Sequence, residues 1–454
     1  MKKLSVLMTA GMVLVSLHMG ILAEESRDTG LTSNASETGD KAGPITGLKM
    51  ETSGAGYMMF GQVESGYSHG RYKEGPIDHQ WLDFYGGQIM LTSNPNSWFT
   101  TKIGLEVRSG FPITTTSGIM KETFRIQYRS FLPRAEGIFD WNFGNFCSLL
   151  IESGIFQYNF NPEIKNLGNY LYRGIAYPLF LETKLDYPWA DLMAIRSQVG
   201  FLNNQIKLEG IINSAITHAP FYDFSLGFTA SYTTPKKTLE VGVGVCFDRL
   251  WSVDDKATDA KSLYGTPGWD SSWTLRGTKL DSRLTFDFKP MIGNPAFFGP
   301  EDGKIYGEAA ILGLKDYNYF EDPNFNTTLL HRMPVLLGIN IPGFKILDLM
   351  SFELEWFGNP YANDWWGGLD GNQSPKPFDI KTADSTWADI YKNKDNFKWT
   401  IYLKKSISKF DIIGIAANDH IIYDTYNAEA QANTEQSLRE PKNWHWYIKL
   451  QYNL

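Results

Sequence analysis

One segment of the chain, Lys279–Lys289, sorts its side chains by parity into two chemically opposite sets. Its even positions include Leu280, Leu284 and Phe286, whereas its odd positions carry only Lys, Asp, Arg and Thr. Successive side chains of a strand point to opposite faces, so a strand here has one apolar face and one charged face. The same alternation recurs over residues 57–454 in segments of about ten residues, which is the length that a tilted strand needs to cross a bilayer. The pattern predicts an all-β fold, a transmembrane antiparallel up-and-down β-barrel with lipid outside and water inside.

The alternation predicts about 16 strands, in a range of roughly 14 to 18. The predicted segments are Tyr57–Ser68, Trp81–Thr92, Trp98–Arg108, Lys121–Arg129, Phe146–Gln157, Met193–Phe201, Gln205–Ser214, Asp223–Tyr232, Thr238–Phe247, Lys279–Phe288, Lys304–Gly313, Met333–Asn340, Leu349–Phe357, Phe397–Lys405, Phe410–Asn418 and Trp444–Leu454. A soluble β-sandwich or a propeller is the alternative, but soluble strands rarely turn large apolar residues outward this regularly.

The connections between these segments alternate in length. Short ones carry turn residues, as in Leu202-Asn203-Asn204, and the long ones reach 39 residues, over Gly358–Asn396. Laid down from a periplasmic start, the strands place the short turns on the periplasmic side, the long loops outside and both termini in the periplasm. Two segments fit less well, because Ser130–Asn145 and Lys289–Gly303 must then be long periplasmic links. Two further alternating stretches, 179–185 and 137–143, are left as candidate extra strands.

The beginning of the chain is typical of a secreted protein. Lys2 and Lys3 precede the mostly apolar Leu4–Leu22, and Ala23 offers a small residue for cleavage. We expect residues 1–23 to be a signal peptide, with an uncleaved membrane anchor as the alternative. Residues 24–50 are rich in Ser, Thr, Gly and Asp and predict a flexible periplasmic tail, so the barrel domain is expected over residues 51–454.

Composition excludes several classes of function. The formal net charge of −8 argues against a nucleic-acid partner. After the signal there is no apolar run near 18 residues, so no membrane-spanning helix is expected. The two cysteines, Cys147 and Cys246, show no metal-ligand spacing and are expected to be packing residues rather than a disulfide. No cofactor or metal is expected, since the run Asp254-Asp255 with Asp259 matches no calcium loop.

Two common catalytic motifs are absent. The sequence contains neither the metalloprotease H-E-x-x-H nor the P-loop. His218 and His420 lie near the ends of predicted strands, where outer-membrane hydrolases hold their catalytic groups, but no Ser with a convincing partner accompanies them. We therefore expect a protein that is not an enzyme.

The final segment carries the most specific resemblance. Its even positions from Trp444 to Leu454 hold Trp, Trp, Ile, Leu, Tyr and Leu, alternating with polar or amphipathic residues up to the end of the chain. This resembles the porin-like outer-membrane β-barrel proteins of Gram-negative bacteria, although that family most often ends on Phe. No characterised substrate-specific subfamily is matched.

The resemblance implies a location in the cell outer membrane, reached through the periplasm, with lipid and lipopolysaccharide around the barrel. It also implies insertion by the barrel-assembly machinery, which reads the C-terminal strand, and it makes a homotrimer one candidate assembly. The implied function is a porin, a passive diffusion channel for small hydrophilic solutes and ions.

A barrel of this size leaves an aqueous channel unless something fills it. Inward-facing charges are expected to line that channel and to sort solutes by charge, or merely to keep the pore wet. The predicted pore-lining residues are Lys102, Glu106, Arg108, Arg125, Arg129, Lys279, Asp281, Arg283, Asp287, Glu353, Glu355, Lys398, Lys404 and Lys449. Within this set, Arg108, Arg125 and Arg129 come from neighbouring predicted strands and could form a basic wall.

Two loops carry further predictions. The third outer loop has apolar residues that can anchor it, so it is expected to be ordered, and by resemblance it folds into the lumen as a constriction. Glu163, Lys165 and Arg173 are placed at that constriction, with a surface cap as the alternative. Trp365 and Trp366, deep in the longest loop, could stack on sugars, which leaves an adhesin or structural surface protein as the second function.

Overall fold

The computed structural model describes a barrel that begins at Met50. The residues it describes are 50–65, 78–110, 113–116, 119–121, 129–144, 146–173, 181, 183, 185, 188–214, 216, 222–255, 259–261, 272–274, 276–314, 329–358, 397–427, 432–438 and 443–454. The expected signal peptide and tail therefore lie outside the described residues, except for Met50, which is already part of the first strand.

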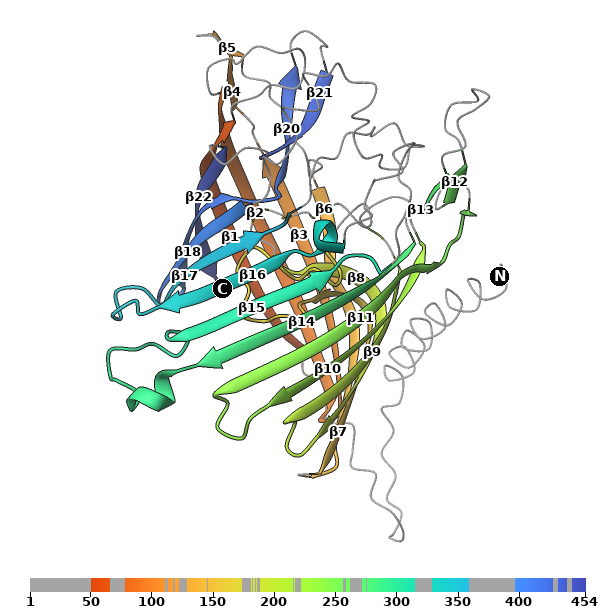
Figure 1. The fold of residues 1–454 in the computed structure, drawn as a ribbon. Helices are drawn as coiled ribbons and strands as arrows, with labels where there is room; N and C mark the ends of the chain where they lie inside the picture. Colours follow the sequence, from red (N-terminus) through yellow and green to blue (C-terminus); the bar gives the residue numbers. More distant parts are fainter. Residues whose placement is uncertain are drawn as a thin grey trace, which may run out of the picture. The chain divides into compact units, whose positions relative to one another are not determined.

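Sixteen antiparallel strands pair in chain order, and the last pairs with the first, which closes the ring (Figure 1). The strands of the ring are β1 (Met50–Ser65), β2 (Asp78–Asn96), β3 (Phe99–Gly110), β6 (Arg129–Asn142), β7 (Cys147–Tyr158), β8 (Ala190–Phe201), β9 (Ile206–Ser214), β10 (Phe224–Thr233), β11 (Leu239–Trp251), β14 (Gly277–Asp287), β15 (Lys304–Ile311), β16 (Val335–Ile341), β17 (Leu349–Trp356), β18 (Phe397–Ile407), β19 (Phe410–Asn418) and β22 (Trp444–Asn453). The predicted up-and-down barrel is thus confirmed, and a sandwich or a propeller is ruled out.

Short elements complete the described chain. β4 (Ile113–Thr116) and β5 (Ile119–Lys121) form a hairpin, and β4 pairs with the beginning of β2. Two separate hairpins are β12 (Asp259–Lys261) with β13 (Ser272–Thr274), and β20 (Ile422–Asn427) with β21 (Ala432–Ser437). The 3-10 helices are η1 (Lys289–Ile292) and η2 (Leu329–Arg332). Within the described residues, no helix has both the length and the apolar character to cross a membrane.

The two faces of the strands have opposite chemistry, as the alternation predicts. On β14, Leu284 is 45% exposed on the outside of the ring, whereas Asp281 and Lys279 are 4% and 5% exposed on the inside. On β3, Leu105 is exposed and its neighbour Glu106 is buried. A soluble protein buries its large apolar residues and exposes its charges, so this reversed distribution is that of a barrel with an apolar solvent outside.

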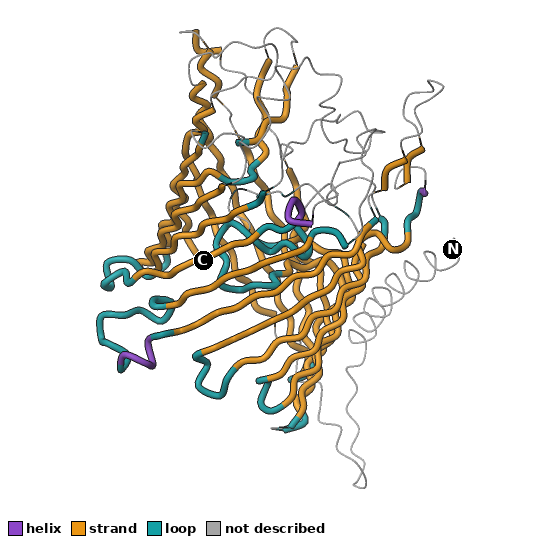
Figure 2. Tube along the Cα trace, in the orientation of Figure 1, coloured by secondary structure: helices purple, strands orange, loops and turns teal. Residues whose placement is uncertain are grey.

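Connections are short at one end of the ring and longer at the other (Figure 2). At the short end, residues with positive φ make the tight turns, including Asn203 (57°), Lys237 (55°) and Ser408 (54°). The connection between β14 and β15 is the long one that the sequence predicts at this end. There, Asp302 accepts backbone N–H groups of Gly299 and Gly343, which ties two neighbouring turns together.

One strand prediction is wrong. The segment Lys121–Arg129 was expected to be the fourth strand of the ring, but the fourth strand is β6, Arg129–Asn142. The expected long link over Ser130–Asn145 is therefore mostly strand. The extra candidate strand over residues 137–143 is the end of β6, whereas the described residues of 179–185 make only an isolated bridge, from Thr183 to Ile421. Pro133 and Gly137 hide the strand signal of β6, since both residues are uncommon in strands.

Candidate functional site

The inside of the barrel is the candidate site, because charged side chains and an ordered loop meet there. The loop follows β7, and residues 159–173 of it, hereafter the inward loop, lie among the strands (Figure 2). Its apolar residues Ile164, Leu167 and Leu171 are 2%, 0% and 0% exposed. Burying such side chains contributes about 1.5–3 kcal/mol each, so the loop is fixed rather than free in solvent.

The apolar contacts of the inward loop connect it to distant strands. Ile164 and Leu167 pack in a cluster with Tyr306 on β15, Leu336 on β16 and Phe357 after β17. The two ends of the loop, at Phe160 and Leu171, pack with side chains of β7, β8, β9 and β11. Since β7 and β17 are far apart around the ring, the loop must cross the interior to make both sets of contacts.

Three buried carboxylates hold the backbone and one side chain of this loop. Glu353 on β17 accepts the N–H groups of Lys165 (2.6 Å), Asn166 (3.0 Å) and Leu167 (2.8 Å). Glu308 on β15 accepts the N–H of Tyr170 at 2.8 Å, and the Tyr170 hydroxyl donates to Glu355 on β17 at 2.7 Å. We call Glu308, Glu353 and Glu355 the loop-binding carboxylates. Hydrogen bonds to charged groups contribute about 1.5–3 kcal/mol each, so this set adds to the attachment that the apolar anchors provide.

Side-chain amides and histidines extend the attachment. Asn166 donates to Thr400 on β18 (2.9 Å) and to Asp419 after β19 (2.6 Å). Glu355 also contacts His420, and Asp419 lies 3.7 Å from His445 on β22. His420 is thus buried in a structural network, and the described residues contain no cluster that could hold a metal ion.

A later part of the same connection reaches another wall. Leu181 joins the cluster around Tyr306, and Thr183 forms a backbone bridge with Ile421. Leu185 and Phe84 of β2 both pack against two buried clusters, one of Val63, Ile421 and Leu438 and the other of side chains from β1, β19 and β22. The connection between β7 and β8 therefore covers inner surface from β11 round to β2, together with part of β7 and β8. The inner face is less covered on β3, on β6 and at Arg196 of β8, where basic side chains keep 19% to 30% of their surface exposed.

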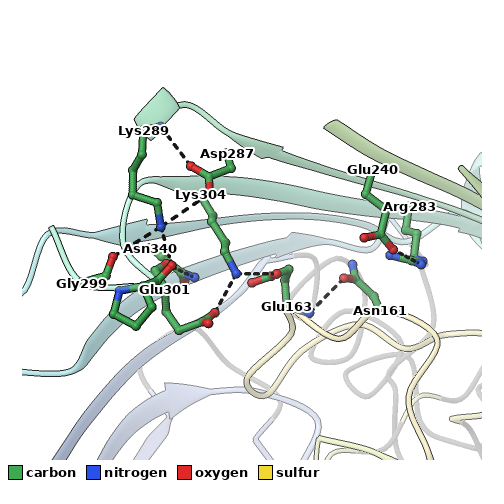
Figure 3. A network of polar contacts seen from close by, with 11 residues as sticks. Asn161, Glu163, Glu240, Arg283, Asp287, Lys289, Gly299, Glu301, Lys304 and Asn340 are labelled. Atoms are coloured by element: carbon green, nitrogen blue, oxygen red, sulfur yellow. Dashed lines mark hydrogen bonds and ion pairs between the residues drawn. The ribbon is translucent and has the colours of Figure 1, made fainter. Parts of the chain in front are cut away.

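The three predicted constriction residues have different surroundings. Glu163 forms an ion pair with Lys304 of β15 (2.8 Å), and Lys304 forms a second one with Glu301 (2.7 Å; Figure 3). Burial lowers the pKa of the Lys165 ammonium, although the neighbouring Glu163 and Glu353 carboxylates oppose that change. Arg173 turns back to carbonyl oxygens of its own loop, at Asn166 (2.6 Å) and Gly168 (3.2 Å), and is 6% exposed.

Several predicted pore-lining residues lie inside but are covered. Glu353 and Glu355 are 0% and 1% exposed and hold the loop, and Lys398 is 1% exposed and donates to the carbonyl of Leu438. Asp281 is buried with Glu308. These residues therefore contact other protein groups and have almost no surface exposed to water.

Four other predicted pore-lining residues form ion pairs. These pairs are Lys279 with Asp248 (3.2 Å), Arg283 with Glu240 (2.5 Å; Figure 3), Asp287 with Lys289 (3.5 Å) and Lys404 with Asp411 (3.5 Å). Lys449 lies with its ammonium 4.6 Å from the centre of the Tyr57 ring.

Among the described side chains of this less covered wall, four cations lie in ion pairs. Arg108 lies beside Glu106 (3.6 Å), Lys102 and Arg134 both contact Glu136 (3.1 and 3.4 Å), and Arg196 bridges Glu152 (3.0 Å) and Glu209 (2.5 Å). We call Lys102, Arg108, Arg134 and Arg196 the cation row. Sequence reasoning missed Arg134, because β6 was misplaced, and Arg196, although its parity within β8 places it on the inner face.

Other predicted residues lie outside the described chain. Arg125, Trp365 and Trp366 are among them, and of Arg129 only the backbone is described, where it pairs with Arg108 across β3 and β6. The proposed three-arginine wall is therefore untested. Both cysteines are free thiols, with Cys246 buried inside the barrel.

Comparison with known proteins gives fold similarity at low identity. No family model and no curated protein matches the chain. Among solved structures, a mutant of Rh. blastica porin aligns at 8% identity and a TM-score of 0.40, covering 89% of this chain and 100% of that one. OmpF of Salmonella typhi aligns at 8% and 0.41, covering 90% and 98%, and an anion-selective porin from Comamonas acidovorans at 10% and 0.44, covering 90% and 100%.

Proposed function

We propose that this protein is an outer-membrane porin, a passive diffusion channel for small hydrophilic solutes, and that the inward loop limits its cross-section. One observation carries the proposal: a closed ring with apolar side chains outside and ion-paired charges inside holds an ordered loop on its inner wall. Charges inside a sealed apolar core would cost several kcal/mol each unless paired, whereas a wet lumen tolerates them.

The location follows from the same surface. An apolar belt on the outside of a closed barrel is stable only where lipid replaces water, which supports a place in the outer membrane of a Gram-negative cell. We include in the proposal that residues 1–23 direct export and that β22 is the strand read during insertion. Membrane fractionation with N-terminal sequencing of the mature protein tests this part.

Planar-bilayer recording tests the channel itself. The purified, detergent-folded protein should add current in steps of uniform size when inserted into a lipid bilayer. Liposome swelling with neutral sugars of increasing mass should then show a size limit, as expected for passive diffusion. A folded protein that adds no current and admits no sugar contradicts the proposal.

The part played by the loop needs its own variant. Removing the apolar anchor with Leu167→Ser should raise the single-channel conductance, because the loop then leaves the inner wall. Leu105→Ser, on the outer face of β3, is the control and should leave the conductance unchanged. Equal conductance in both variants and the wild type would show that the loop does not limit the passage.

A further inference from the structure

The ion pairs on the less covered wall share one asymmetry. Side chains of the cation row are 19% to 30% exposed, whereas those of their carboxylate partners are 0% to 12% exposed. In every pair it is therefore the positive group that reaches water. Exposed charges act on solutes, while a buried partner acts mainly on its own neighbour.

Tyrosines hold two of the four partner carboxylates, Glu209 and Glu106. The hydroxyl of Tyr158 donates to Glu209 at 2.5 Å, and that of Tyr57 donates to Glu106. The guanidinium groups lie over the same rings, with Arg196 5.5 Å from the centre of Tyr158 and Arg108 5.6 Å from that of Tyr57. Each ring thus contacts a guanidinium group while its hydroxyl binds the carboxylate. The carboxylate is therefore held below the surface of the wall, and the guanidinium group is the more exposed of the two.

Another wall shows the opposite order. On β11 and β14, Glu240 is 30% exposed and its partner Arg283 only 8%, and Asp248 is 21% exposed and Lys279 6%. The asymmetry of the cation row is therefore not a general property of long basic side chains in this barrel. The loop-binding carboxylates add no exposed negative charge, since the loop covers them.

We propose that the cation row is a binding path for small anions, which makes the channel prefer anions that carry carboxylate or phosphate groups. The inference deepens the proposed function, since it names the solute class for the same lumen. Three of the four cations are guanidinium groups, and guanidinium binds planar carboxylate and phosphate oxygens in a bidentate manner. The row runs over β3, β6 and β8, and the acids that pair with it are only 0% to 12% exposed, so the cations are the more accessible groups of these pairs.

Zero-current potentials of the whole mature protein, measured under a KCl gradient in a planar bilayer, test the proposal. The wild type should show a chloride-to-potassium permeability ratio above one. Arg134→Gln should lower that ratio about three- to fourfold, because one charge acts on the two ions in opposite directions across about 6 Å of water at about 0.1 M salt. Inorganic phosphate should also block the chloride current of the wild type at lower concentration than that of Arg134→Gln.

Two further variants keep the result specific. Lys405→Gln is the control, because Lys405 is about as exposed (29%), pairs with Asp348 and lies on the outward face of β18. The permeability ratio of this variant should equal that of the wild type. Glu136→Gln removes a sheltered acid and should raise the ratio. A conducting wild type with a ratio of one or less overturns the inference while leaving the channel proposal intact, and so does an unchanged ratio in Arg134→Gln. Absence of any current overturns both.

Discussion

Replacing Glu353 by Gln tests how the inward loop is held. One carboxylate oxygen accepts the N–H groups of Asn166 and Leu167, and the other accepts that of Lys165 and the hydroxyl of Tyr306. Gln keeps a single oxygen, so its amide nitrogen must face two groups that now donate to Glu353. The Tyr306 hydroxyl can turn to accept, but the Lys165 N–H cannot.

The magnitude follows from this geometry. One backbone N–H loses its acceptor in a buried place, which costs about 1–3 kcal/mol, and the surviving bonds change from charged to neutral, which weakens each by about 1 kcal/mol. Since bonds in one network are not additive, we expect a net loss of about 2–4 kcal/mol in the free energy that holds the loop on the wall.

Two measurements on Glu353→Gln follow. Single-channel records should show a larger mean conductance with added noise, because the loop leaves the wall for part of the time. Trypsin should cleave after Lys165 or Arg173 much faster than in the wild type. Asp411→Asn is the control, since it removes one inward charge on β19 away from the loop. If Glu353→Gln and the wild type have the same conductance and the same cleavage rate, the reasoning about the carboxylate is wrong.

Three other outcomes are expected. Leu167→Ala should lower the protection of the inward loop from trypsin, because truncating a fully buried Leu costs about 2–5 kcal/mol, and an unchanged cleavage rate would argue against tight packing. Gly154→Ala should lower the thermal unfolding temperature of the barrel, since φ is +130° and a Cβ would lie 2.0 Å from a carbonyl oxygen of β6, whereas Gly137→Ala, with only ordinary contacts, should not. Burial raises the pKa of Glu301, but the hydrogen bond from Lys304 and the charges of the neighbouring lysines together outweigh burial and leave the pKa lowered. The stabilising contribution of Glu301 is therefore present above the unfolded value of about 4.3 and is lost as pH falls through the folded value. Hydrogen exchange in residues 288–303, corrected for intrinsic rates, should therefore speed up in acid, and constant protection down to about pH 3 would contradict this.

Most of the ring could be predicted from parity alone, because each face of a barrel strand contacts one kind of solvent. The prediction failed at β6, where Lys121–Arg129 alternates more clearly than the true strand. The 129–142 strand instead depends on partners that alternation does not report, such as Glu136 beside Lys102 and Phe139 stacked on Phe99 at 4.5 Å. The local pattern therefore favours Lys121–Arg129, whereas pairing with β3 and β7 places the strand at Arg129–Asn142.

The interior was less predictable than the ring. Glu353 and Arg108 have the same inward parity, yet the first lies beneath the loop and the second contacts water. The difference depends on which strands the loop reaches across the barrel, through contacts separated by up to 253 residues in the chain. The apolar residues of the loop indicated that it would be ordered, but nothing in the sequence names the carboxylates to which it binds.

The crossing of the loop also has a mechanical consequence. A ring of strands held only by its neighbours can flatten, because bending each pair slightly breaks no hydrogen bond. Here a segment leaving β7 is attached to β15, β17 and β18, so any flattening along that direction must stretch or compress the attachment. The loop therefore resists flattening of the barrel along that direction and helps to fix the dimensions of its cross-section.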